Sequence, residues 1–128
     1  MIYNNKIYYN YDKESKILYK HYTGLIKIED IISSWNYAFE MNLLSRQVKG
    51  IILDYSRASF ALKIKMDTEI VIFYLENLNF FGGLRIAVVL SNLDEFIVPM
   101  LARHEEYGLD SALFICMDRA KNWIIKNG

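Results

Sequence analysis

The chain has 128 residues, of which 53% are hydrophobic and 15% aromatic, so residues 1–128 can bury a bulky core as a single domain. Lys and Arg balance Asp and Glu at 15 each, and the formal net charge is zero. Proteins that bind nucleic acid usually carry a basic surface, because counterion release drives their affinity. We therefore expect no nucleic-acid partner.

The cysteine content and the apolar runs bear on the compartment. A single cysteine, Cys116, excludes an internal disulfide and is typical of a reducing environment. The opening Met-Ile-Tyr-Asn-Asn-Lys lacks the charged and then apolar regions of a signal peptide. No apolar run approaches the ~20 residues that a transmembrane helix needs. We expect a cytoplasmic protein with no membrane span.

The first predicted unit is an antiparallel β-hairpin. Ile7–Tyr11 and Lys16–Tyr22 are rich in β-forming residues, and the polar Asp12–Ser15 separates them. Thr23-Gly24 is predicted to end the second strand. Alternation divides that strand into two faces: Ile17, Tyr19 and His21 on one, and Leu18, Lys20 and Tyr22 on the other.

Residues 27–42 are predicted to form an amphipathic helix, because apolar residues recur at spacings of three and four. Glu29 and Asp30 fall in its first turn, where negative charge favours the helix dipole. The apolar stripe consists of Ile28, Ile31, Ile32, Trp35 and Phe39.

Val48–Tyr55 is predicted to be a central strand, and Ser56–Lys65 a loop of mixed polarity. Asp67 is a plausible amino-terminal cap for a second helix that continues to Leu78. Phe80–Gly83 is expected to stop that helix, because its two glycines disfavour helical backbone.

Leu84–Leu90 is almost wholly apolar, as in a strand covered on both faces. The next segment has two interpretations: a helix from Asp94 to Tyr107 that bends at Pro99, or a helix that begins at Pro99. Gly108 ends the helix in both cases.

A last strand at Ser111–Ile115 and a last helix at Asp118–Lys126 complete the order ββαβαβαβα. Parallel neighbours need a helical crossover, so this order predicts an α/β fold: a mixed sheet with parallel central strands packed by helices. The predicted core includes Trp35, Ile52, Val71, Val88, Phe114 and Trp123.

Ligands of open α/β sheets collect outside the carboxyl ends of the strands, so the polar residues after the predicted strands are the candidate site. The candidates form one rim: Asp54, Ser56, Arg57, Ser59, Ser91 and Asn92. Arg57 is the expected anchor, because its guanidinium can pair with a carboxylate or phosphate in a fork geometry. The alternative is a solvated loop in which Asp54 caps local backbone amides.

The remaining reactive side chains have a structural and a functional interpretation each. His21 and His104 lack a local ligand set, so we interpret them as structural rather than as metal or acid–base groups. Cys116 precedes a predicted helix, where a thiolate is favoured, but a small buried residue is the simpler interpretation. The tyrosines near the amino end fit an interface or an ordinary hairpin equally well: Tyr3, Tyr8, Tyr9 and Tyr11.

Several motifs together resemble the STAS family of sulphate-transporter domains and anti-sigma-factor antagonists. Thr23-Gly24 followed by a helix with Trp35, and the strand ending in Leu53-Asp54, resemble the opening half of small STAS-like proteins. The tail matches the family's phenylalanine, alanine and tryptophan–leucine pattern at Phe114, Ala120, Trp123 and Ile124. The resemblance spans about residues 6–126, and the fold is related to that of CRAL-TRIO lipid-binding domains.

The resemblance implies a single STAS-like domain that is not an enzyme and needs no cofactor or metal. It implies a regulatory or protein-interaction module; a binder of a small apolar or lipid-like ligand, in a pocket lined by residues such as Phe73, Phe80 and Phe81, is the alternative. A homodimer is possible. Antagonist members carry a phosphorylated serine after the Asp54 strand, but Ala61–Lys65 offers no matching serine.

Overall fold

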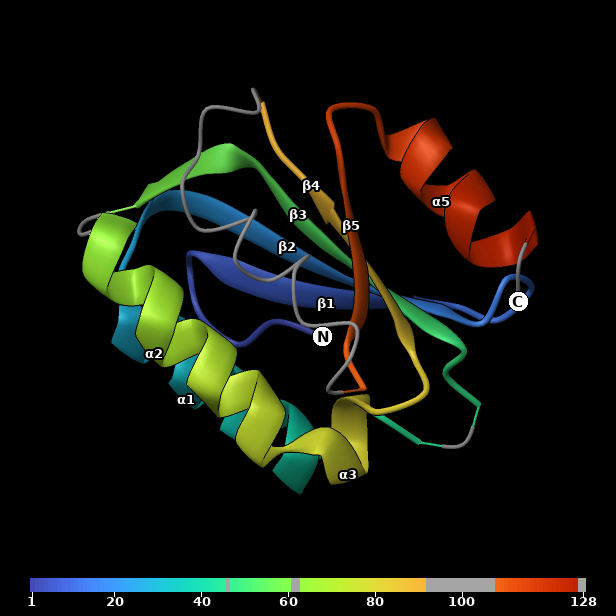
Figure 1. Cartoon of the computed structure of the whole chain (residues 1–128), viewed down its shortest axis with the longest axis horizontal. Helices are drawn as coiled ribbons and strands as arrows, with labels where there is room; N and C mark the ends of the chain where they lie inside the picture. Colours follow the sequence, from blue (N-terminus) through green and yellow to red (C-terminus); the bar gives the residue numbers. More distant parts are fainter. Residues whose placement is uncertain (46, 61–62, 92–107, 127–128) are drawn as a thin grey trace.

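The structure is a computed structural model that describes residues 1–45, 47–60, 63–91 and 108–126, without the side chains of residues 63–68 (Figure 1). The strands are β1 (Ile7–Asp12), β2 (Ile17–Ile26), β3 (Gly50–Phe60), β4 (Arg85–Val89) and β5 (Asp110–Phe114). The helices are α1 (Ile28–Glu40), α2 (Lys63–Glu76), α3 (Leu78–Phe81) and α5 (Met117–Lys126).

The five strands form one sheet in the order β1-β2-β3-β4-β5. β1 pairs with β2 in antiparallel fashion, and the remaining pairs are parallel. The predicted α/β fold, its hairpin and its parallel central strands are therefore confirmed. Within the described ranges, every helix is too short or too polar to cross a bilayer.

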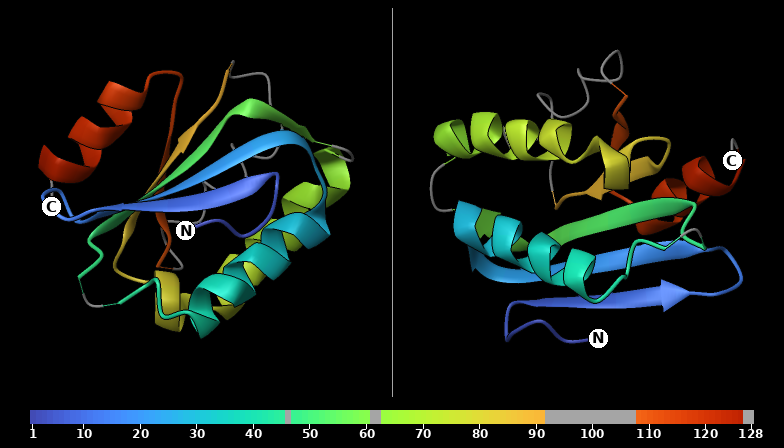
Figure 2. Two further views of the ribbon diagram at one scale, coloured as in Figure 1. Left: turned by 180° about the vertical axis from the view of Figure 1, so that it is seen from behind. Right: turned by 90° about the horizontal axis from the view of Figure 1, so that it is seen from below.

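Helices cover the two faces of the sheet unequally. α1, α2 and α3 lie together on one face, and α5 is the one described helix on the other, next to β4 and β5 (Figures 1 and 2). The large core cluster belongs to the first face, and a smaller cluster packs under α5. Trp35, Ile52, Val71 and Val88 are buried as predicted, whereas Phe114 and Trp123 are half-buried against the smaller cluster.

Three predicted boundaries were wrong. β2 does not end at Thr23-Gly24 but runs on to Ile26, and β3 continues through the predicted loop to Phe60. The two extensions pair with each other, and this pairing satisfies backbone groups that a loop would leave to water. α2 begins at Lys63, so Asp67 lies inside the helix and is not its cap. The predicted helix around Pro99 lies outside the described residues.

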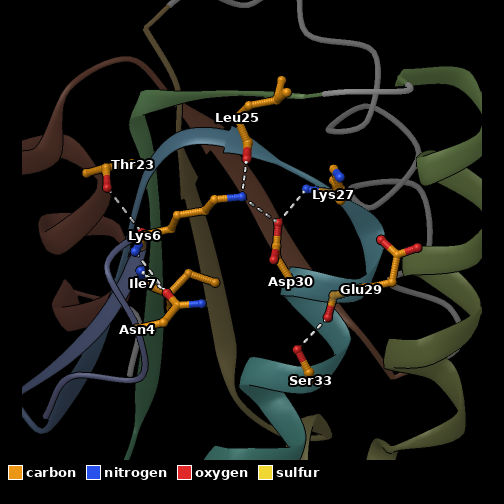
Figure 3. Close-up of polar contacts among 9 residues, drawn as sticks. All are labelled: Asn4, Lys6, Ile7, Thr23, Leu25, Lys27, Glu29, Asp30 and Ser33. Atoms are coloured by element: carbon orange, nitrogen blue, oxygen red, sulfur yellow. Dashed lines mark hydrogen bonds and ion pairs between the residues drawn. The ribbon is translucent and has the colours of Figure 1, made fainter.

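The start of α1 is joined to the hairpin by hydrogen bonds (Figure 3). The Asp30 carboxylate accepts from the Lys27 backbone amide at 2.9 Å and from the Lys6 ammonium at 3.4 Å. The same ammonium donates to the carbonyl of Leu25 at 3.0 Å. Because these contacts link the residue before β1, the end of β2 and the first turn of α1, they fix the direction in which the chain enters the helix.

Lys20 is an unusual core residue, since its side chain is 0% exposed. Its ammonium nitrogen lies 3.9 Å from the ring centroid of Trp35 and 4.9 Å from that of Tyr22, and it has no hydrogen-bond partner among the described residues. Burial lowers the pKa of this amine well below its ordinary value. A cation–π contact is worth about 2 kcal/mol in such a site, less than the several kcal/mol that burial of an ion costs.

Replacing Trp35 with alanine should destabilise the protein by about 3–5 kcal/mol, because the indole is fully buried. It also donates a hydrogen bond to the Tyr74 hydroxyl at 2.9 Å. Trp123→Ala should cost roughly half as much, since that ring is only half-buried. Urea unfolding of the two variants measures the difference, and equal losses would contradict the assignment of the two helix faces.

Lys20→Met should raise the free energy of unfolding by about 1–3 kcal/mol, because it removes an unpaired buried amine and keeps its length. The folded amine has a lowered pKa, so the unfolded chain binds more protons and the wild type gains stability as pH rises. The advantage of the variant should therefore shrink toward about pH 10, the ordinary lysine range. Lys13→Met, at an exposed position, is the control and should change stability by less than about 0.5 kcal/mol.

Candidate functional site

A β-bulge in β3 determines where the candidate side chains point. His21 pairs with Asp54 and Thr23 pairs with Arg57, so one residue of β2 lies opposite two residues of β3. The extra residue reverses the alternation: Tyr55 and Ala58 both lie against the main core, and Asp54 and Arg57 both fall on the other face. Without the bulge, Arg57 would point into the core.

Asp54 and His21 form a hydrogen-bonded pair across the parallel β2–β3 ladder. The Nδ1 atom of His21 lies 2.8 Å from the Asp54 carboxylate, and the two side chains are only 18% and 16% exposed. Because an ionised carboxylate only accepts, Nδ1 carries the proton and Nε2 is left for another partner. The pair thus fixes both the tautomer and the orientation of the imidazole.

The second Asp54 oxygen accepts hydrogen bonds from the Ser56 hydroxyl at 2.6 Å and from the Ser56 amide at 3.0 Å. Burial raises the pKa of the Asp54 carboxyl, but the hydrogen bonds from His21 and Ser56 outweigh burial and hold the pKa below its ordinary value. Asp54 is therefore an ionised group whose charge is already committed to neighbours.

Two tyrosines stack on the His21 ring. The centroid of Tyr8 lies 4.5 Å from that of His21 with the planes at 20°, and the centroid of Tyr19 lies 6.0 Å away at 3°. Tyr8 comes from β1 and is 44% exposed, so an aromatic surface borders the pair. The stack leaves the imidazole little freedom to rotate away from Asp54.

These groups surround a hollow of about 260 Å³, which we call the β2–β3 hollow. Its lining consists of Tyr8, His21, Tyr22, Thr23, Asp54, Ser56 and Arg57. Arg57 is exposed, and among the described residues no carboxylate pairs with it. The hollow therefore contains a carboxylate that is already hydrogen-bonded to its neighbours and a guanidinium that pairs with no described carboxylate.

The predicted rim is only partly assembled. Asp54, Ser56 and Arg57 line the hollow together, and Ser59 is exposed farther along β3. These residues lie within a strand and not beyond its end, because β3 outlasts β4: Asp54 is level with Val89, the last residue of β4. Ser91 is exposed but does not line the hollow, and Asn92 lies outside the described residues.

Tyr8, His21 and Thr23 line the hollow but were absent from the predicted site. The only signal for His21 was its shared face with Ile17 and Tyr19, which indicates no partner until β2 is placed next to β3. Cys116 lies between β5 and α5 as predicted but is exposed, so its interpretation as a small buried residue was wrong. His104 lies outside the described residues.

A second hollow is less suited to a ligand. It has a volume of about 390 Å³ and lies between the hairpin turn and α5, and its charged lining residues are acids and lysines in equal number: Asp12, Glu14, Lys49 and Lys121. Asp12 already accepts a hydrogen bond from Ser15 at 2.7 Å. In the part of the chain that the structure describes, no three His, Cys, Asp or Glu side chains gather to hold a metal ion.

Comparison with known proteins gives no relative. No protein-family model matches the chain, and neither a curated protein nor a solved structure matches it. The resemblance to the STAS family therefore stays a prediction, and function has to be argued from the geometry of the β2–β3 hollow.

Asp54→Asn should destabilise the protein by about 1–2 kcal/mol at neutral pH, because it weakens charged hydrogen bonds with His21 and Ser56. The pKa of the folded carboxyl is lowered, so its stabilisation is present above about pH 4 and is lost as pH falls further. Unfolding at about pH 7 and about pH 3 should show the gap between variant and wild type closing in acid. A gap that stays constant, or an equal loss in the exposed control Glu14→Gln, would contradict the role given to Asp54.

Proposed function

We propose that the chain is a non-enzymatic interaction module of STAS-like type, which binds a protein partner through the β2–β3 hollow and the sheet face around it. Single-cysteine composition supports a cytoplasmic location. α5 packs over β4 and β5, whereas no described element covers the hollow or Tyr8 on the same face. A half-exposed tyrosine next to an arginine is typical of the residues that dominate binding energy at interfaces.

The observation that carries the proposal is the state of Arg57. Asp54, the one carboxylate among the described lining residues, is bound to His21 and Ser56, and the bulge turns the guanidinium to the open face. An arginine whose neighbouring acid is already bound by other groups is available to an external acid, and its fork geometry favours a planar oxyanion.

A small apolar or lipid-like ligand remains the alternative. The observation in its favour is the buried Lys20 amine, which could meet an acidic head group within the layer between sheet and helices. Against it, the rings expected to line such a pocket pack against other aromatic rings. The ring centroids of Phe80 and Phe39 are 3.9 Å apart, and those of Phe73 and Phe81 are 6.4 Å apart. Native mass spectrometry of protein purified from its own host distinguishes a retained ligand from a protein complex or a homodimer.

Arg57→Ala should weaken partner capture about tenfold, because it removes a charge-assisted pair at the centre of the site. The measurement is quantitative cross-linking and capture from a host lysate with wild type, Arg57→Ala and Arg119→Ala as bait. Arg119 is an exposed arginine of α5 and should behave as wild type. Unfolding free energies of both variants should stay within about 0.5 kcal/mol of wild type.

Two outcomes would overturn the proposal. One is an Arg57→Ala variant that unfolds, because Arg57 would then be structural. The other is a partner whose cross-links fall wholly on the hairpin edge or on α1 and α2, away from the hollow.

A further inference from the structure

We infer that the β2–β3 hollow is a carboxylate site, in which an acidic peptide places a carboxylate against the Arg57 guanidinium and beside the His21 ring. The inference rests on the proposed function, since it names the chemical group that the protein partner presents. Both side chains line the same hollow of about 260 Å³, which is ample for a carboxylate and the start of its side chain.

The hydrogen-bond inventory of the hollow points to an anion. Ser56 donates its hydroxyl to Asp54 at 2.6 Å, and Thr23 donates its hydroxyl to the Lys6 carbonyl at 3.3 Å. The nearby carboxylate already accepts from His21 and Ser56. The charged donor left over among the described lining residues is Arg57, so a ligand that complements the hollow must supply the negative charge.

A carboxylate fits this inventory better than a phosphate. Phosphate sites usually offer several free backbone amides, often at a glycine-rich turn. In the hollow the Ser56 amide is taken by Asp54 at 3.0 Å, and none of the described lining residues is a glycine. Asp54 also repels a dianion more strongly than a monoanion. A single guanidinium matches a planar monoanion through two parallel hydrogen bonds.

His21 forms one wall of the same hollow. The groups that face its ring are Tyr8 from β1, Tyr19 from β2 and Asp54 from β3, and among the described lining residues the uncommitted cation is Arg57. Asp54 holds Nδ1 and fixes the orientation of the ring. The exposed Tyr8 ring that stacks on His21 offers an apolar surface to the side chain that carries the carboxylate.

The test is an NMR titration of the ¹⁵N-labelled full chain with phenylacetate and, separately, inorganic phosphate. Phenylacetate carries a carboxylate and a ring that can lie against Tyr8. We expect saturable shifts at Tyr8, His21 and Arg57 with phenylacetate and weaker binding of phosphate. Affinity should fall about tenfold in Arg57→Ala and stay unchanged in Arg119→Ala.

Three outcomes would overturn the carboxylate assignment. They are tighter binding of phosphate than of phenylacetate, the absence of saturable shifts, and an affinity for phenylacetate that Arg57→Ala leaves unchanged.

The NMR titration tests the carboxylate site and the capture experiment tests the proposed function, so either can fail while the other succeeds. Partner capture that depends on Arg57, with no binding of phenylacetate, would overturn the carboxylate site and support the proposed function. Phenylacetate binding with capture that ignores Arg57→Ala would support the carboxylate site and overturn the proposed function.

Discussion

The structure depends on the parallel pairing of β2 with β3, the two longest strands of the sheet at 10 and 11 residues. Parallel neighbours require a crossover, and α1 supplies it, so this one ladder places both a helix and the central strands. It also creates the functional geometry, because it brings His21 and Asp54 together from positions 33 residues apart. One extra residue in β3 then turns Arg57 toward the same face.

The helices cover the two faces of the sheet unequally, and this separates the main core from the hollow. Under α1 and α2 the aromatic rings of Trp35, Phe39, Tyr74 and Phe81 form edge-to-face and stacked pairs within the larger of the two core clusters. Lys20 sits within that layer at a cost in free energy, because water is excluded and no acid pairs with it among the described residues. Among the described residues, α5 covers only part of the opposite face, and the polar side chains of the hollow lie on the rest of it.

The sequence was sufficient for the fold and for part of the site. Hydrophobic periodicity located all five strands and α1, because burial on one or both faces imposes a period of 2.0 or 3.6 residues. The strand extensions to Ile26 and Phe60 were missed, because their polar residues are as common in loops as in strands. Only the pairing of the two extensions with each other makes them strands. Asp54, Ser56 and Arg57 were predicted, since they follow a buried run.

By contrast, composition and periodicity could not place His21 next to Asp54. Its partner is determined by a register that the sequence does not encode locally, and one residue of slip would have turned it to the core with Lys20 and Tyr22. The same holds for the bulge: the side to which Arg57 points depends on whether one or two residues of β3 oppose Tyr22. Such features belong to long-range pairing, which no window of sequence reveals.

The arrangement around Asp54 resembles the carboxylate–histidine part of a catalytic triad, so its fit to catalysis has to be weighed. In a triad the imidazole takes a proton from a nucleophile, which must lie within hydrogen-bond reach of the second ring nitrogen. The two aliphatic hydroxyls of the described lining donate elsewhere: that of Ser56 to the Asp54 carboxylate at 2.6 Å, and that of Thr23 to the Lys6 carbonyl at 3.3 Å. Cys116 follows β5, which is separated from β3 by the whole of β4. A carboxylate that fixes an imidazole, next to a free guanidinium and an aromatic wall, is better suited to hold an anion in place than to transfer its atoms. These features support a binding role for the hollow.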